Sequence, residues 1–191
     1  MLTTNRKLKD PSAWYHIVFV WDTGNGTAGN RQRMYINGVE ETSFATDTNP
    51  SSGRVSFVND ASHEHWIGRG STQSEANNFD GYLAEVAFCD GQAYAASDFG
   101  ETDDNGIWIP KKLGVTFGSQ GYYLEFKQTG TSQNASGIGA DTSGNANHWA
   151  VTNLAATDIT TDSPTNNFCI ANFLDQNGSY ALSEGNCQLT S

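Results

Sequence analysis

Short apolar runs, separated about every ten residues by polar, glycine-rich segments, are the feature that most restricts the fold of this chain. Residues 13–21, 54–58, 65–68 and 121–126 are such runs, rich in β-branched and aromatic side chains. No segment of ten or more residues has the apolar spacing of an amphipathic helix. Many short strands at this spacing predict an all-β fold, an antiparallel sandwich or barrel.

Local patterns predict individual elements within that fold. Residues 13–21 are apolar at both odd and even positions, so we expect a strand covered on both faces. Residues 31–44 predict a hairpin, with a strand through Ile36, a turn at Asn37-Gly38 and a return strand through Phe44. Residues 79–92 alternate like a strand with one buried face, and 91–101 have room for one helical turn.

The composition changes after Phe126. Residues 127–147 have almost no large apolar side chains and predict a long loop or linker, whereas 148–154 resemble one more strand. The remaining residues have no hydrophobic cluster large enough for a core of their own. We therefore predict a β-sandwich over 1–127, and over 128–191 an irregular extension that packs on the sandwich or leads to a further domain.

The charge balance restricts the partners. The chain has 10 basic and 21 acidic residues and a net charge of -11. Nucleic acid is an unsuitable partner, because its binding depends on Lys and Arg that neutralise phosphates. Anionic membrane surfaces are disfavoured for the same reason, and no stretch is long enough to insert in a membrane. Neutral sugars, cations and protein surfaces remain.

The three cysteines, Cys89, Cys169 and Cys187, form no C-x-x-C pair. An odd number without such a pair indicates neither a zinc site nor a disulfide framework. Three free thiols are expected, and a single bridge between Cys169 and Cys187 is the alternative.

Four motifs follow one another between about residues 12 and 90. They are a Trp-x-His strand (Trp14, His16), a Tyr-x-Asn-Gly hairpin (Tyr35, Asn37, Gly38), an Ile-Gly step (Ile67, Gly68) and a closing strand (Phe79, Asp80, Gly81, Glu85, Val86). In this order they resemble a concanavalin A-like, laminin G-like domain. The resemblance implies an antiparallel jelly-roll β-sandwich.

Later segments narrow the resemblance. Residues 98–112, 121–126, 141–149 and 162–168 are similar to long virion proteins of marine bacteriophages, such as tail fibres. The resemblance implies a place in the phage particle, with host-surface glycans or other virion proteins as partners, and otherwise a soluble chain.

The chain departs from the family pattern at its start, since only about a dozen residues precede the Trp-x-His strand, where such domains have several strands. Either the chain is part of a longer one, or another chain or its own C-terminal segment replaces these strands. Because exposed sheet edges associate, we expect a homo-oligomer or a borrowed strand.

The related glucanases carry Glu-x-Asp-x-x-Glu on one strand, and this motif is absent here. Glu85 has only Asp80 and Asp90 near it, each five residues away and therefore on the opposite face of a strand. We interpret Glu85 as a structural residue paired with Arg69, Arg54 or a backbone donor. No catalytic residue is predicted, and a polysaccharide-degrading hydrolase or lyase-like sandwich, which would need paired carboxylates, is the alternative.

No cofactor is required, but laminin G-like domains often bind calcium through rim loops. Among the Asp- and Asn-rich loops, Asp141 and Asn145 are the candidate ligands. The alternative is ordinary turn chemistry, which uses the same residue types.

Sugar binding needs exposed aromatic rings beside polar groups. Trp66 with Arg69, Trp108 and Trp149 lie next to polar loops, although aromatic residues in short strands more often belong to the core than to a sugar site. The sequence therefore predicts a non-catalytic carbohydrate- or receptor-binding domain of a virion appendage. A purely architectural virion protein is the second alternative.

Overall fold

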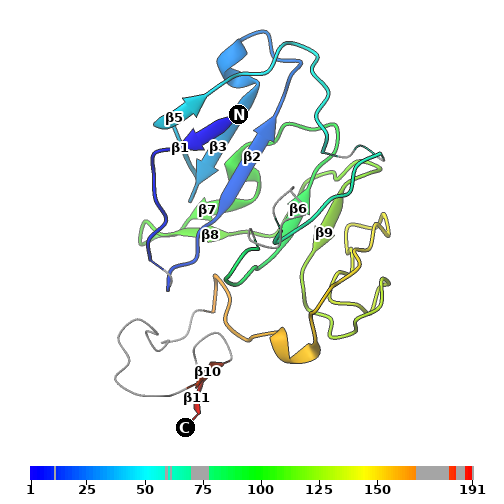
Figure 1. Ribbon diagram of the computed structural model, residues 1–191. Helices are drawn as coiled ribbons and strands as arrows, with labels where there is room; N and C mark the ends of the chain where they lie inside the picture. The colour runs from blue at the N-terminus through cyan, green and yellow to red at the C-terminus, as the bar shows by residue number, and fades with distance from the viewer. Residues whose placement is uncertain are drawn as a thin grey trace.

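The computed structural model (Figure 1) describes most of the chain. The described residues are 1–10, 12–58, 60, 62–69, 78–166, 181–183 and 188–190. The predicted alternative of a Cys169–Cys187 bridge lies outside them.

Every strand pair in the described part of the chain is antiparallel, and that part contains no α-helix. The strands are β1 (Leu2–Thr4), β2 (Ile17–Trp21), β3 (Gln32–Ile36), β4 (Val39–Glu40), β5 (Phe44–Asp47), β6 (Val86–Phe88), β7 (Gly100–Thr102), β8 (Trp108–Pro110), β9 (Tyr122–Leu124), β10 (Ala181–Ser183) and β11 (Gln188–Thr190). Short 3-10 turns lie at Ala28–Asn30, Ala96–Asp98 and Ala156–Asp158. The predicted all-β class is therefore confirmed, and so is one helical turn within 91–101.

The Asn37-Gly38 turn forms as predicted. Both residues have positive φ, 49° and 77°, which is the geometry that an Asn-Gly hairpin turn requires. The turn joins β3 to β4, but β4 has only two residues, and the predicted return strand through Phe44 does not continue on β3. Instead β5, which begins at Phe44, pairs with β1.

The core lies between the β2–β3 sheet and the β7–β8 hairpin. Val20, Tyr35 and Ala96 are buried together, and Val18 and Trp108 pack against them. Gly38 has no side chain because a Cβ there would overlap the ring of Trp108. The hairpin turn and the core thus depend on the same glycine.

The expectation that both faces of residues 13–21 are covered is wrong. Val18 and Val20 face the core, whereas Ile17, Phe19 and Trp21 on the other face are 53%, 52% and 38% exposed. On this second face the neighbouring strand β3 is covered at Ile36, the partner of Ile17, which is only 3% exposed. Apolar residues at both parities therefore indicate a second packing surface that the described residues leave open.

Three predicted strands do not form. Residues 54–58, 65–68 and 148–154 make no strand ladder, and Val55 is 85% exposed. Strand propensity mainly measures the fit of a side chain to a half-buried sheet, and no described strand forms a ladder with these segments. Instead, Gly53 donates its backbone N–H to the carbonyl of Thr23, and the Thr23 hydroxyl donates to the carbonyl of Arg54. Trp149 donates its backbone N–H to the carbonyl of Gly139.

Residues 127–147 are a loop, as predicted, but a loop that packs on the β6–β9 pair. Ile138, Ala140 and Asp141 are buried in it. Asp141 forms a bridge to Leu124, and Thr142 donates its N–H to the carbonyl of Tyr123 at 2.8 Å. Figure 1 shows β6 and β9 side by side with this loop next to them.

Candidate functional site

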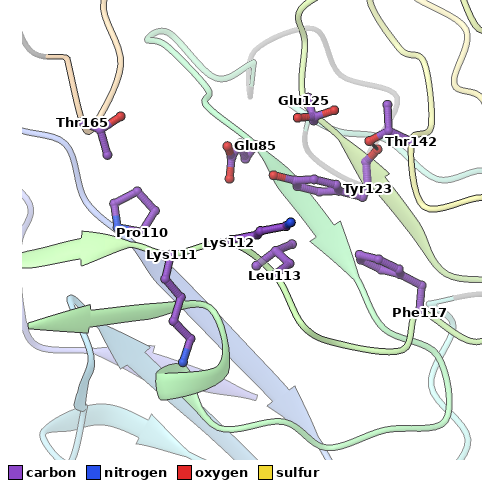
Figure 2. Close-up of a pocket in the computed structure, with 10 residues that line it drawn as sticks. All are labelled: Glu85, Pro110, Lys111, Lys112, Leu113, Phe117, Tyr123, Glu125, Thr142 and Thr165. Carbon is purple, nitrogen blue, oxygen red and sulfur yellow. Dashed lines mark hydrogen bonds between the residues drawn. The ribbon is translucent and has the colours of Figure 1, made fainter.

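A groove of about 490 Å³ lies between the β6–β9 pair and the segment that follows β8. Figure 2 shows the side chains that line it, which come from separate parts of the chain. The lining residues are Glu85, Pro110, Lys111, Lys112, Leu113, Phe117, Tyr123, Glu125, Thr142 and Thr165.

Strand register brings the acidic side chains to this groove. Ala87 of β6 lies opposite Tyr123 of β9. Side chains two residues apart in a strand share a face, so Glu125 lies on the Tyr123 face. Glu85 precedes Ala87 by the same spacing, although its φ of 56° takes it out of the regular strand. The groove therefore has two carboxylates near the Tyr123 ring.

Tyr123 is held firmly in this position. The ring of Phe117 stacks on it at 5.9 Å with an interplanar angle of 14°. Its N–H donates to Asp141 Oδ1 at 2.8 Å, and its carbonyl accepts from the N–H of Thr142 at 2.8 Å. Tyr123 and Phe117 thus form an aromatic wall of the groove, in which ring stacking and backbone hydrogen bonds both hold Tyr123 in place.

Asp141 organises the loop behind that wall. Its carboxylate accepts four hydrogen bonds of 2.8–2.9 Å, from the N–H groups of Tyr123, Ser143 and Asn147 and from the Ser143 hydroxyl. Burial opposes its ionisation, but these hydrogen bonds outweigh burial and lower the pKa of Asp141. The side chain acts as a charged anchor for the loop.

The two glutamates of the groove have different surroundings. Glu125 pairs with Lys127, and this hydrogen bond lowers the pKa of Glu125. The Tyr123 hydroxyl points toward Glu85 in Figure 2. Burial raises the pKa of Tyr123, and the hydrogen bond and charge of Glu85 raise it further. Tyr123 is therefore a neutral donor, and its two acidic neighbours favour that state.

This arrangement suits a ligand rich in hydroxyl groups. Carboxylates accept hydrogen bonds from hydroxyls, and the aromatic pair Phe117–Tyr123 offers apolar surface for the C–H face of a ring. Retaining hydrolysis needs two carboxyl groups, one of which has a raised pKa so that it acts as the acid. The pKa of Glu125 is shifted in the opposite direction.

The four aromatic and arginine residues predicted to bind sugar lie elsewhere. Trp66 is 46% exposed, and the guanidinium of Arg69 lies 4.7 Å from its ring centroid. Trp108 packs on the core and donates its Nε1–H to His16 Nδ1 at 3.1 Å. Trp149 is half-buried against the edge of Tyr122. Only Trp66 with Arg69 presents an exposed ring.

The two predicted calcium ligands lie close together in the loop but have protein partners. The oxygens of Asp141 accept the four bonds described above. Asn145 donates its amide to the carbonyls of Gly118 and Gly121, the latter at 2.9 Å. The described part of the chain has no cluster of three or more metal-ligating His, Cys, Asp or Glu side chains.

The predicted partner of Glu85 is corrected by the structure. Its neighbour is the Tyr123 hydroxyl rather than Arg69 or Arg54. Arg69 lies over Trp66, and the carbonyl of Arg54 accepts from Thr23. The pairing was hidden because 33 residues separate β6 from β9 in the sequence, as their bounds show.

Sequence reasoning missed the other groove residues, above all Tyr123, Glu125 and Lys112. Residues 121–126 were identified as a strand, and the shared parity of Tyr123 and Glu125 is visible in it. What the sequence does not show is which strand lies beside it, and therefore that Glu85 joins them.

The comparisons with known proteins agree with this fold. Residues 2–98 match a laminin G family model described as the concanavalin A-like lectin/glucanases superfamily. The match includes Glu85 but not the groove residues from 110 onward. Searches of curated proteins and of solved structures found no match. Together with the antiparallel strands, the family match confirms the predicted concanavalin A-like β-sandwich. No helix in the described residues has the length and apolar character to cross a membrane.

Proposed function

Since this chain belongs to the concanavalin A-like lectin/glucanases superfamily, we propose that it is a non-catalytic carbohydrate-binding domain of a bacteriophage virion appendage. The groove beside Tyr123 is the proposed binding site. The observation that carries the proposal is the pairing of a fixed aromatic wall with two carboxylate side chains in one groove.

The proposed ligand is a neutral polysaccharide of the host surface. A sugar ring would pack on the Tyr123–Phe117 wall, with its hydroxyls donating to Glu85 and Glu125. Lys112 and the Tyr123 hydroxyl would donate to ring or hydroxyl oxygens. The net charge of -11 supports a neutral rather than an acidic glycan.

The virion setting rests on the resemblance to marine phage proteins in residues 98–112, 141–149 and 162–168. In a symmetric appendage, weak sites are repeated, so that the combined affinity exceeds that of one groove. The proposal needs no cofactor, and the engagement of Asp141 in four hydrogen bonds supports binding without calcium.

A polysaccharide-degrading activity is the second candidate, favoured by one observation. Glu85 and Glu125 both line the groove beside Tyr123, and retaining hydrolysis needs two carboxyl groups at its site. The hydrolase also needs a carboxyl group that stays protonated as the acid, and the lowered pKa of Glu125, which pairs with Lys127, does not suit that role. We therefore propose binding rather than cleavage.

The test is incubation of the purified chain with a panel of bacterial and algal polysaccharides, with calcium and with chelator. We expect selective binding, unchanged by chelator and without new reducing ends. Release of reducing ends, lost in the Glu85→Gln variant, would establish the hydrolase instead. If the folded chain binds none of the polysaccharides, a purely architectural role in the virion is favoured and the proposal is overturned.

A further inference from the structure

One lining residue of the groove, Thr165, comes from a part of the chain far from the others in sequence. Figure 2 shows Thr165 and Pro110 on the side of the groove away from Phe117 and Thr142. Thr165 is exposed, so solvent and ligands reach its hydroxyl group from the groove. The groove therefore has a second wall, at a distance from the aromatic wall of Tyr123 and Phe117.

A tight turn fixes the position of Thr165. Ser163 and Asn166 exchange two backbone hydrogen bonds, of 3.2 and 3.1 Å, so that Pro164 and Thr165 form the tip of the turn. Proline is favoured at the first of these two positions, because its ring fixes φ at the value that the turn needs. The Thr165 side chain is thus presented by a short turn with little conformational freedom.

Trp14 anchors the start of this turn. Its indole Nε1–H donates to Asp162 Oδ2 at 3.1 Å, in a partly buried hydrogen bond that joins residues 148 positions apart. Two residues after Trp14, His16 Nδ1 accepts from the indole N–H of Trp108 at 3.1 Å. Trp108 begins β8, and β8 ends at Pro110. The same short segment therefore holds both parts of the chain that form the second wall.

We propose that the groove has two adjoining subsites, so that its ligand is a glycan chain of at least two sugar units rather than a single sugar. The inference rests on the proposed glycan binding and deepens it. One unit packs on the Tyr123–Phe117 wall. The next unit lies against Pro110 and exchanges hydrogen bonds with the Thr165 hydroxyl, which both donates and accepts as sugar hydroxyls do.

The size of the groove agrees with two units. Its volume of about 490 Å³ falls within the range of roughly 300–1,000 Å³ for sites that hold drug-sized ligands, and a single sugar ring is smaller than such a ligand. Thr165 contacts the second unit in this arrangement. Trp14 and Asp162 act through Thr165 and are positioning residues.

The first experiment compares single sugars with disaccharides by NMR titration of the full chain. The probes are glucose, galactose and mannose and their β-1,4-linked disaccharides. We expect the wild-type chain to bind a disaccharide at least tenfold more tightly than its single sugar. Thr165→Val should weaken disaccharide binding about fivefold, the contribution of one hydrogen bond, and leave the single sugar unchanged. Thr165→Ser keeps the hydroxyl and should restore most of the affinity.

The matched control is Thr161→Val, the same change at an exposed threonine of the same segment that does not line the groove. It should bind both sugars like wild type. Tyr123→Ala should weaken both sugars, because both use the aromatic wall. Circular dichroism checks that each variant folds.

The second experiment tests the anchor. Trp14→Phe removes the indole donor but keeps an aromatic ring, and it should weaken the disaccharide without affecting the single sugar. Trp21→Phe is its control, since no groove residue lies on β2, and it should bind like wild type.

Three results would overturn the two subsites. They are a disaccharide that binds no better than its single sugar, disaccharide binding unchanged in Thr165→Val, and equal losses for both sugars in Thr165→Val or Trp14→Phe. With binding still lost in Tyr123→Ala, the proposed function would survive each of them. A folded wild-type chain that binds none of the probes would overturn the proposed function together with this inference.

Discussion

Asp141→Ala should destabilise the whole groove loop, and its cost follows from the hydrogen bonds of the carboxylate. The side chain accepts four bonds and is 7% exposed. Removing it leaves three backbone N–H groups without an acceptor, in surroundings that water reaches poorly. At about 1 kcal/mol or more for each lost bond, we expect a loss of about 3–5 kcal/mol in the free energy of unfolding.

The assay is urea unfolding followed by tryptophan fluorescence. With a slope of about 2 kcal/mol per molar urea, the midpoint should fall by about 2 M. Asp103→Ala is the control, since Asp103 also accepts backbone bonds, from Asn105 and Ile107, but at the surface. Water replaces those bonds, so its midpoint should fall clearly less.

Two further measurements separate the anchor from other roles of Asp141. Because its pKa is lowered in the folded state, its contribution is present above the unfolded value of 3.8 and is lost as pH falls through the folded pKa. The gap between wild type and Asp141→Ala should therefore close in acid. A loss below about 1 kcal/mol at neutral pH would refute the hydrogen-bond reasoning. A calcium-dependent rise in Tm that the variant abolishes would show a metal ligand instead.

Three more predictions concern other parts of the fold. Burial lowers the pKa of His16 below 6.5, so the unfolded chain takes up a proton before the folded chain does, and the free energy of unfolding should fall as pH drops from about 6.5 to the folded pKa. Urea midpoints measured across this pH range check the prediction, and His16→Gln should make them less dependent on pH. In Gly38→Ala the new methyl group would have an unfavourable φ of 77° and would overlap the ring of Trp108, so the free energy of unfolding, measured with urea, should fall by about 2–4 kcal/mol. The control is Gly91→Ala, where φ is 74° but no atom lies near the new methyl group, and the loss should be about 1 kcal/mol. Burial raises the pKa of the Cys89 thiol to about 11, so peptide mapping should show alkylation at pH 8 about a hundredfold slower than for an ordinary thiol; an ordinary rate would contradict it.

The all-β class and the first hairpin were predictable because their signals are local. Asn37-Gly38 forces a turn through its own backbone preferences, whatever surrounds it. Residues 54–58 failed for the opposite reason. A β-branched, aromatic segment becomes a strand only when another strand lies beside it, and no local pattern supplies that partner.

The groove escaped prediction because it joins distant segments. Glu85 reads as a mid-strand residue, yet its φ of 56° lies outside the strand region, and its neighbour Tyr123 comes from β9. Asp141 lies in a stretch of Gly, Ser and Asn that resembles a linker. One buried carboxylate turns that stretch into a folded loop, and sequence composition does not register a single residue of this kind.

The most direct test of the account is the affinity of two variants for the glycan that the wild-type chain selects. Tyr123→Ala removes the aromatic wall of the groove, and Trp66→Ala removes the exposed ring that lies outside it. Titration calorimetry should show at least a tenfold weaker Kd for Tyr123→Ala. Burial of the tyrosine ring against a sugar contributes about 1.5 kcal/mol or more to the free energy of binding, which corresponds to that factor. Trp66→Ala should bind like wild type. The reverse result, with binding lost in Trp66→Ala and kept in Tyr123→Ala, would contradict the assignment of the groove as the binding site.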